Sequence, residues 1–83
     1  MRLVYFASVR EALGTAEEQR ELPPHILTIH ELVLWLADQS PDHASALADM
    51  DRLRFALDQQ MVAAGALIGN STELAIFPPV TGG

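Results

Sequence analysis

The stretch "TIHELVLWLA", Thr28 to Ala37, carries the clearest helix signal in the chain and decides which folds are possible. Thr28 and Glu31 match a capping box, in which the threonine hydroxyl accepts from the glutamate amide and the glutamate side chain reaches back to the cap. The apolar residues recur at helical spacing on one side only: Ile29, Leu32, Val33, Leu36 and Ala37. A helix with one apolar stripe covers one face of a small sheet, so we expect a two-layered α+β domain.

Two apolar segments outside this helix predict the centre of the sheet. "RLVYF", Arg2 to Phe6, and "ELAIF", Glu73 to Phe77, are strand-length runs that are apolar enough on both sides to be central. Placing the first and last strands side by side explains why both are so apolar. The arrangement that fits is a β-grasp: a mixed sheet with one main helix on one face, plus short helices.

The remaining elements are shorter. "SVRE", Ser8 to Glu11, matches a second capping box and predicts a helix that begins at Ser8 and ends near Gly14. Residues 16–22 are charged, which is typical of an edge strand protected from unwanted pairing. Residues 40–51 predict one more helical turn, and residues 52–58 predict a strand with one solvated face.

Composition bounds the class of protein. The chain has 83 residues, the size of one small domain, and no cysteine, which excludes disulfides and thiolate chemistry. Its formal charge is −6 and all of its basic side chains other than histidine are arginines, so nucleic acid and anionic membranes are poor partners. A basic protein partner fits this charge, as does a role in solubility alone. Without a signal-peptide layout or an apolar run of roughly 18 residues, we expect a cytoplasmic protein.

The C-terminus "FPPVTGG", Phe77 to Gly83, is unusual for a chain end. Its two prolines continue the strand as a stiff, extended stalk, so we expect a domain over residues 1–77 and a tail over residues 78–83. Gly82 and Gly83 have no Cβ and fit a passage too narrow for side chains. The tail then delivers its terminal carboxylate, which requires activation by an ATP-using partner.

The chain resembles the small, sulfur-carrying subunit of molybdopterin synthase over nearly its whole length. The similarity lies in "YFASVREALG", "TIHELVLWL", "LRFALDQQMV" and "ELAIFPPVTGG", and it departs at Asp58 and in "LIGNSTE". It implies a ubiquitin-like fold and an adenylating enzyme, related to ubiquitin activators, that uses ATP and magnesium to activate the Gly83 carboxylate. It further implies a thiocarboxylate that gives its sulfur to cyclic pyranopterin monophosphate in a large subunit, within a heterotetramer.

The resemblance and the strand pattern together assign roles to the tail and its surroundings. Gly83 carries the sulfur, Gly82 gives steric access, and Pro78, Pro79, Val80 and Thr81 guide the tail. By strand alternation, Leu74 and Ile76 face the helix while Ala75 and Phe77 face the open side. Phe6 and Phe77 then form a partner-binding patch with Arg10 at its rim. The alternative is that both phenylalanines belong to the core.

Other chemistry finds little support in the sequence. His25, His30 and His43 lack the spacing of a metal site, and the chain is expected to bind no cofactor and to have no turnover alone. Ser8 and Thr28 are interpreted as helix caps rather than nucleophiles.

Three further interpretations stay open. The chain could carry sulfur for another pathway, such as thiamine, cysteine or tungsten-cofactor synthesis, although a thiamine carrier would usually be shorter and lack the insertion that holds "SVREALG". It could be a protein modifier joined through Gly83 to a lysine of a target. It could also be an interaction domain whose tail docks without covalent chemistry, and deletion of Gly83 separates this last possibility from the others.

Overall fold

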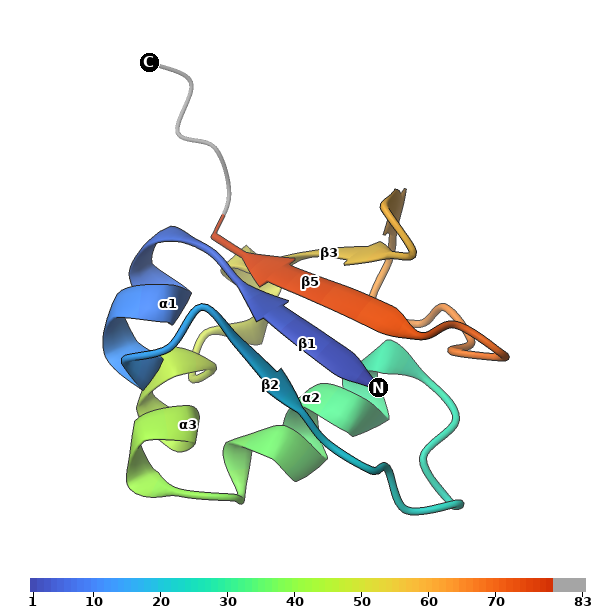
Figure 1. Ribbon diagram of the computed structural model, residues 1–83, viewed down its shortest axis with the longest axis horizontal. Coiled ribbons are helices and arrows are strands. Elements are labelled where there is room, and N and C mark those ends of the chain that lie inside the picture. Colours follow the sequence, from blue (N-terminus) through green and yellow to red (C-terminus); the bar gives the residue numbers. More distant parts are fainter. Residues whose placement is uncertain (79–83) are drawn as a thin grey trace.

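Five strands form one mixed sheet in the computed structural model, which describes residues 1–78 (Figure 1). The strands are β1 (Arg2–Tyr5), β2 (Glu17–Gln19), β3 (Arg54–Leu57), β4 (Gln60–Val62) and β5 (Glu73–Phe77). Their order is β2-β1-β5-β3-β4, with β1 and β5 parallel and all other neighbours antiparallel. The first and last strands therefore lie side by side in the centre, and the predicted β-grasp is confirmed.

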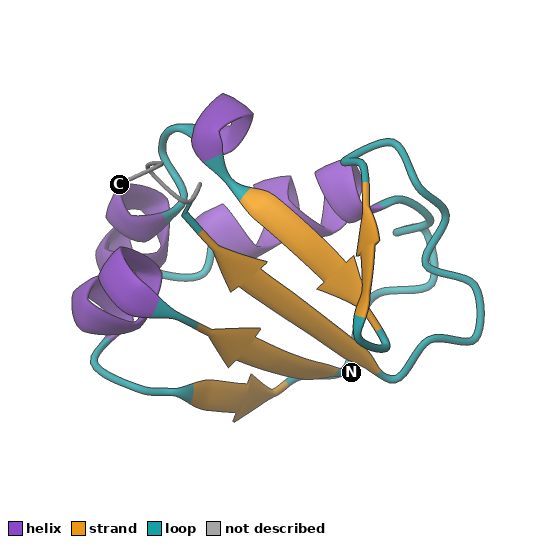
Figure 2. Ribbon diagram, turned by 90° about the horizontal axis from the view of Figure 1, so that it is seen from above, coloured by secondary structure: helices purple, strands orange, loops and turns teal. Residues whose placement is uncertain are grey.

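The helices are α1 (Ala7–Leu13), α2 (Ile29–Ala37), α3 (Pro41–Ala46) and a short 3-10 turn, η1 (Met50–Arg52). Figure 2 shows α2 running behind the sheet, with α1 and α3 beside one end of it. The buried stripe of α2 consists of Ile29, Leu32, Val33 and Leu36, all at 0% exposure. Burial of each such side chain contributes about 1.5–3 kcal/mol. Of the described residues, none belongs to a helix long and apolar enough to cross a membrane.

The capping box that opens α2 is confirmed. The Thr28 hydroxyl accepts from the Glu31 amide at 3.2 Å, and Glu31 Oε1 accepts from the amides of Leu27 and Thr28, each at 3.0 Å. These bonds, first from Leu27 and then from Thr28, lower the pKa of the Glu31 carboxyl. The helix therefore begins where the sequence predicts.

The capping box predicted at Ser8 is wrong. Helix α1 begins at Ala7, and its N-cap is Phe6, two residues before the predicted cap at Ser8, with no side-chain cap. The chain turns sharply at Ala7, whose φ is 49°, and the Phe6 carbonyl accepts from the amides of Val9 and Arg10. Ser8 then lies inside the first turn, where its hydroxyl cannot cap the helix. The predicted end is confirmed, because Gly14 is left-handed with a φ of 71°.

Two further expectations need correction. The segment predicted to hold one helical turn contains both α3 and η1. Strand β3 alternates as predicted, with Phe55 and Leu57 in the core, but its other face is exposed at Arg54 alone, since Ala56 is only 8% exposed. Ala56 pairs with Ala75 of β5, and both small side chains have little exposed area although neither belongs to the core cluster.

Asp58 has a clear structural role in the turn between β3 and β4. Asp58 and Gln59 have φ values of 46° and 72°, the left-handed geometry of a two-residue hairpin turn. Asp58 Oδ1 accepts from the amides of Thr72 and Glu73, each at 3.1 Å, and the Thr72 bond is the largest cause of a lowered Asp58 pKa. The carboxylate thus ties the hairpin to the start of β5.

Candidate functional site

The candidate site lies where the chain leaves the central strand β5. This strand is paired on both sides to its end, with Tyr5 opposite Ile76 and Arg54 opposite Phe77. Pro78 follows directly and lines one surface hollow together with Ser8 of α1. The other predicted tail residues lie outside the described part of the chain: Pro79, Val80, Thr81, Gly82 and Gly83. The exit point of the tail is therefore held by hydrogen bonds to two neighbouring strands.

Phe6 and Phe77 contact each other at this exit. Their ring centroids are 6.1 Å apart and the rings are nearly perpendicular, at 87°, which is a favourable edge-to-face geometry. Phe6 is 46% exposed, Phe77 is half-buried, and neither belongs to the hydrophobic core. The alternative in which both are core residues is wrong. These two residues, the phenylalanine pair, form an apolar surface beside the tail.

The face assignment of β5 follows the predicted alternation. Leu74 and Ile76 are completely buried in the core beneath the sheet. Phe77, the next residue along, is on the opposite face by the pleat of the strand. Arg10 lies one helical turn from Phe6, because its amide donates to the Phe6 carbonyl at 3.3 Å, and its side chain is exposed. The structure thus brings Phe6 and Phe77 together, as the sequence predicts, and places the Arg10 backbone one helical turn from Phe6; the role of Arg10 at the rim stays a prediction.

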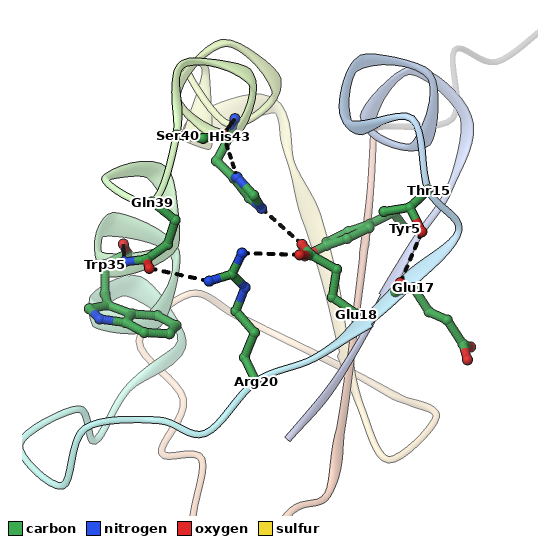
Figure 3. A network of polar contacts seen from close by, with 9 residues as sticks. All are labelled: Tyr5, Thr15, Glu17, Glu18, Arg20, Trp35, Gln39, Ser40 and His43. Carbon is green, nitrogen blue, oxygen red and sulfur yellow. Dashed lines mark hydrogen bonds and ion pairs between the residues drawn. The ribbon is translucent and has the colours of Figure 1, made fainter.

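A second cluster of polar side chains lies on the helix side of the sheet (Figure 3). The Glu18 carboxylate accepts from the Tyr5 hydroxyl at 2.6 Å, from His43 Nε2 at 2.8 Å and from Arg20 Nη2 at 3.1 Å. These four residues are here called the Glu18 network. They join β1, β2 and α3, so the network attaches a helix to the edge of the sheet.

Sequence reasoning missed this network. It interpreted the charges of residues 16–22 only as protection of an edge strand, and it considered His43 only as a metal ligand. The pairing of β1 with β2 provides a signal that could have found it. Glu18 lies opposite the buried Leu3, so its side chain is on the core-facing side of the sheet, where a carboxylate requires partners. His43 is itself only 7% exposed, with Nδ1 2.7 Å from Ser40 Oγ, whereas His25 and His30 are exposed elsewhere.

The electrostatics of the Glu18 network favour a structural role. Burial would raise the pKa of Glu18, but hydrogen bonds from Tyr5, His43 and Arg20 outweigh burial and lower it to about 2. Burial and the same carboxylate raise the pKa of the Tyr5 hydroxyl. Near neutral pH, Glu18 is therefore ionised and Tyr5 protonated, and neither is poised to exchange protons with a substrate. The network is not a candidate catalytic centre.

Comparison with known proteins covers the whole chain, including the tail. A sequence model of the ThiS family matches residues 3–83. The chain is 36% identical over 83 residues to the molybdopterin synthase sulfur carrier subunit of Escherichia coli, covering 100% of this chain and 99% of the relative. It is 30% identical over 83 residues to the subunit of the same name from Haemophilus influenzae, with the same coverage.

A solved structure supports the fold independently. The crystal structure of SAMP1 from Haloferax volcanii superposes with a TM-score of 0.74, covering 100% of this chain and 98% of that chain at 24% identity. Because the identity is low, this likeness bears on the β-grasp architecture alone.

Proposed function

The chain belongs to the ThiS family, and on that premise we propose that it is the sulfur carrier of a molybdopterin synthase. The observation that carries this proposal is the match along the full chain, through Gly83, with two subunits that bear that name. Neither relative is named for thiamine, cysteine or tungsten-cofactor synthesis, or for protein modification. Those interpretations are therefore not favoured.

The proposed chemistry takes place at the Gly83 carboxylate. An adenylating enzyme joins this carboxylate to AMP, with ATP and magnesium as its own substrates and with release of pyrophosphate. Sulfur at the sulfide level then displaces AMP and leaves a C-terminal thiocarboxylate. The carrier next transfers this sulfur to cyclic pyranopterin monophosphate in the large subunit of the synthase. A supply of ATP favours the cytoplasm as the site of the reaction.

The geometry of the described residues supports delivery of the tail to a partner. Strand β5 is fixed on both sides, so the tail starts from a defined point and direction. The phenylalanine pair lies next to that point and offers apolar area of the kind that anchors interfaces. We propose that the large subunit covers this pair while Gly82 and Gly83 enter its active site, in a heterotetramer of two carriers and two large subunits.

Intact-mass spectrometry tests the proposal. The chain is incubated with ATP, magnesium, sulfide and an adenylating enzyme of the ubiquitin-activator type, and a control reaction omits ATP. We expect the mass gain of one oxygen-to-sulfur exchange, confined to the C-terminal peptide and absent from a chain that lacks Gly83. The product should then convert cyclic pyranopterin monophosphate to molybdopterin when the large subunit is added. Transfer of the chain to lysines of other proteins, without molybdopterin, would instead identify a modifier.

A further inference from the structure

The five arginines divide into two groups by their partners. Arg2 forms ion pairs with Glu17 at 2.8 Å and with Glu73 at 3.4 Å, and Arg20 pairs with Glu18 at 3.1 Å. Within residues 1–78, the other arginines have no carboxylate within 4.0 Å: Arg10, Arg52 and Arg54. Unpaired cations are unexpected in a chain whose acidic residues outnumber its basic ones by 11 to 5.

All three of these arginines lie around the exit of the tail. Arg54 is the register partner of Phe77, the last residue of β5. Arg52 lines the same surface hollow, of about 340 Å³, as Pro78. Arg10 comes from α1, next to Phe6, and Figure 1 shows α1 and β3 flanking the end of β5. We call these three residues, all of them exposed, the arginine collar.

Arg54 is also held in position before any partner arrives. Its Nη1 donates to the carbonyls of Asp51 at 3.2 Å and Leu53 at 3.0 Å. A guanidinium that is already fixed loses less conformational entropy when it binds, and its planar fork matches a carboxylate. Asp49 lines the hollow beside Arg52, but no ion pair joins them among the described side chains. The collar therefore offers three cations that no carboxylate of residues 1–78 pairs with, one of them already held in place by backbone carbonyls.

We propose that the arginine collar docks against carboxylates that surround the partner opening into which the tail is inserted. The partner is thus a protein with acidic side chains around the opening that receives the tail. The net charge of this chain, −6, would by itself favour a basic partner, but the three arginines of the collar lie around the tail exit. Attraction at the collar orients the carrier so that the tail meets the opening, and it offsets the repulsion between the partner's carboxylates and the acidic remainder of this chain. This inference rests on the proposed function, because it concerns the same tail and the large subunit that receives it.

Association rates with the purified large subunit of the same organism test the collar. Arg52→Glu and Arg54→Glu are compared with Arg2→Glu, which changes the net charge equally but lies at the other end of β1. We expect the two collar variants to bind about tenfold more slowly at low salt, with the difference shrinking as salt is raised. Arg2→Glu should slow binding less than about twofold, and a thermal unfolding scan verifies that each variant is folded.

The possible outcomes separate this inference from the function on which it rests. If Arg2→Glu slows association as much as the collar variants do, only the net charge of the chain matters. If the collar variants associate faster than the unaltered chain, the partner opening is basic. Either result overturns the proposed role of the collar. Recovery of the rate by an acidic-to-arginine change at the partner's mouth, paired with Arg54→Glu, would support it. If the unaltered chain neither acquires sulfur nor binds the large subunit, the proposed function itself fails. If it does both while the variants bind normally, only the collar fails.

Discussion

Tyr5 and Phe6 are neighbours in the chain, but one side chain is buried on the helix side of the sheet and the other is exposed at the tail exit. Tyr5 is 1% exposed and donates to Glu18 inside a network that joins two strands and a helix. Phe6 is 46% exposed and touches only the last residue of β5 among the aromatic rings of the described chain. One region pairs most of its polar groups internally, with Arg20 Nε the buried side-chain atom left without a partner among the described residues. The other region leaves apolar area uncovered.

The arginines repeat this contrast. Arg20 is bound by Glu18 and Gln39 within the fold, whereas no carboxylate of residues 1–78 pairs with Arg10, Arg52 or Arg54. Groups that are bound within the fold contribute to stability, and groups that are left without partners are available to another protein. We infer from this contrast that the helix side maintains the domain, and the proposed function assigns docking to the tail exit. Changes in the first region should affect unfolding, and changes in the second should affect function.

The largest expected effect comes from Gly82→Val at the tail. Under the proposed function, the tail enters a passage shaped for bare backbone, which a branched side chain would block, so we expect at least about a 100-fold loss of molybdopterin formation. The unfolding midpoint should not change, because β5 ends at Phe77. Gly65→Val is the control, since no atom lies within 4 Å of a Cβ placed there. A Gly82→Val protein with full activity would contradict the narrow passage.

Glu18→Ala should have the largest effect on stability. It leaves Tyr5, His43 and Arg20 without their shared acceptor, and we expect the free energy of unfolding to fall by about 3 kcal/mol in urea titrations. Glu17→Ala is the matched control, because that neighbour makes only an exposed ion pair with Arg2 and should cost less than about 1 kcal/mol. Equal losses in the two variants would break the contrast between the two regions.

Acid should weaken the helix side in a defined pH range. The pKa of the Glu18 carboxyl is about 2 in the folded protein, compared with 4.5 for the ordinary side chain of the unfolded chain. The contribution of Glu18 to folding stability is therefore complete above about pH 5 and is lost as the pH falls toward 2. Tyr5, Arg20 and His43 are the titratable groups that face it. We expect the stability difference between the unaltered protein and Glu18→Gln to shrink by about 2 kcal/mol over this range. A constant difference would mean that Glu18 titrates normally.

Much of the fold could be predicted from the sequence because its signals are local. Thr28 and Glu31 define the start of α2 through contacts only three residues apart, and Gly14 ends α1 through its own backbone freedom. The start of α1 could not be predicted in the same way. There the chain leaves a central strand and turns at Ala7, so the geometry of the sheet overrides the apparent cap at Ser8.

The candidate site was predictable in part for the same reason. Phe77 and Pro78 stand next to each other at the end of a strand, and the motif that contains them marks the tail. The Glu18 network was missed because it joins residues 25 positions apart, Glu18 and His43, through a helix packing that no local pattern encodes. The absence of an ion pair at Arg52 and Arg54 within residues 1–78 likewise depends on where eleven side-chain carboxylates lie in space.

The smallest expected effect is that of removing one ring from the phenylalanine pair, and this change tests directly whether the tail exit is separate from the core. Phe6→Ala removes a half-exposed ring, so we expect the free energy of unfolding to fall by less than about 1 kcal/mol. Binding to the large subunit should weaken about tenfold, measured by calorimetry, because the ring is an anchor only when the partner covers it. Leu27→Ala is the control, since Leu27 is similarly exposed, at 59%, but lines a hollow with Met1 and Leu22 at the opposite end of β1 from Phe6. If Phe6→Ala unfolds easily and binds normally, the ring supports the fold, and the division between the two regions does not hold at Phe6.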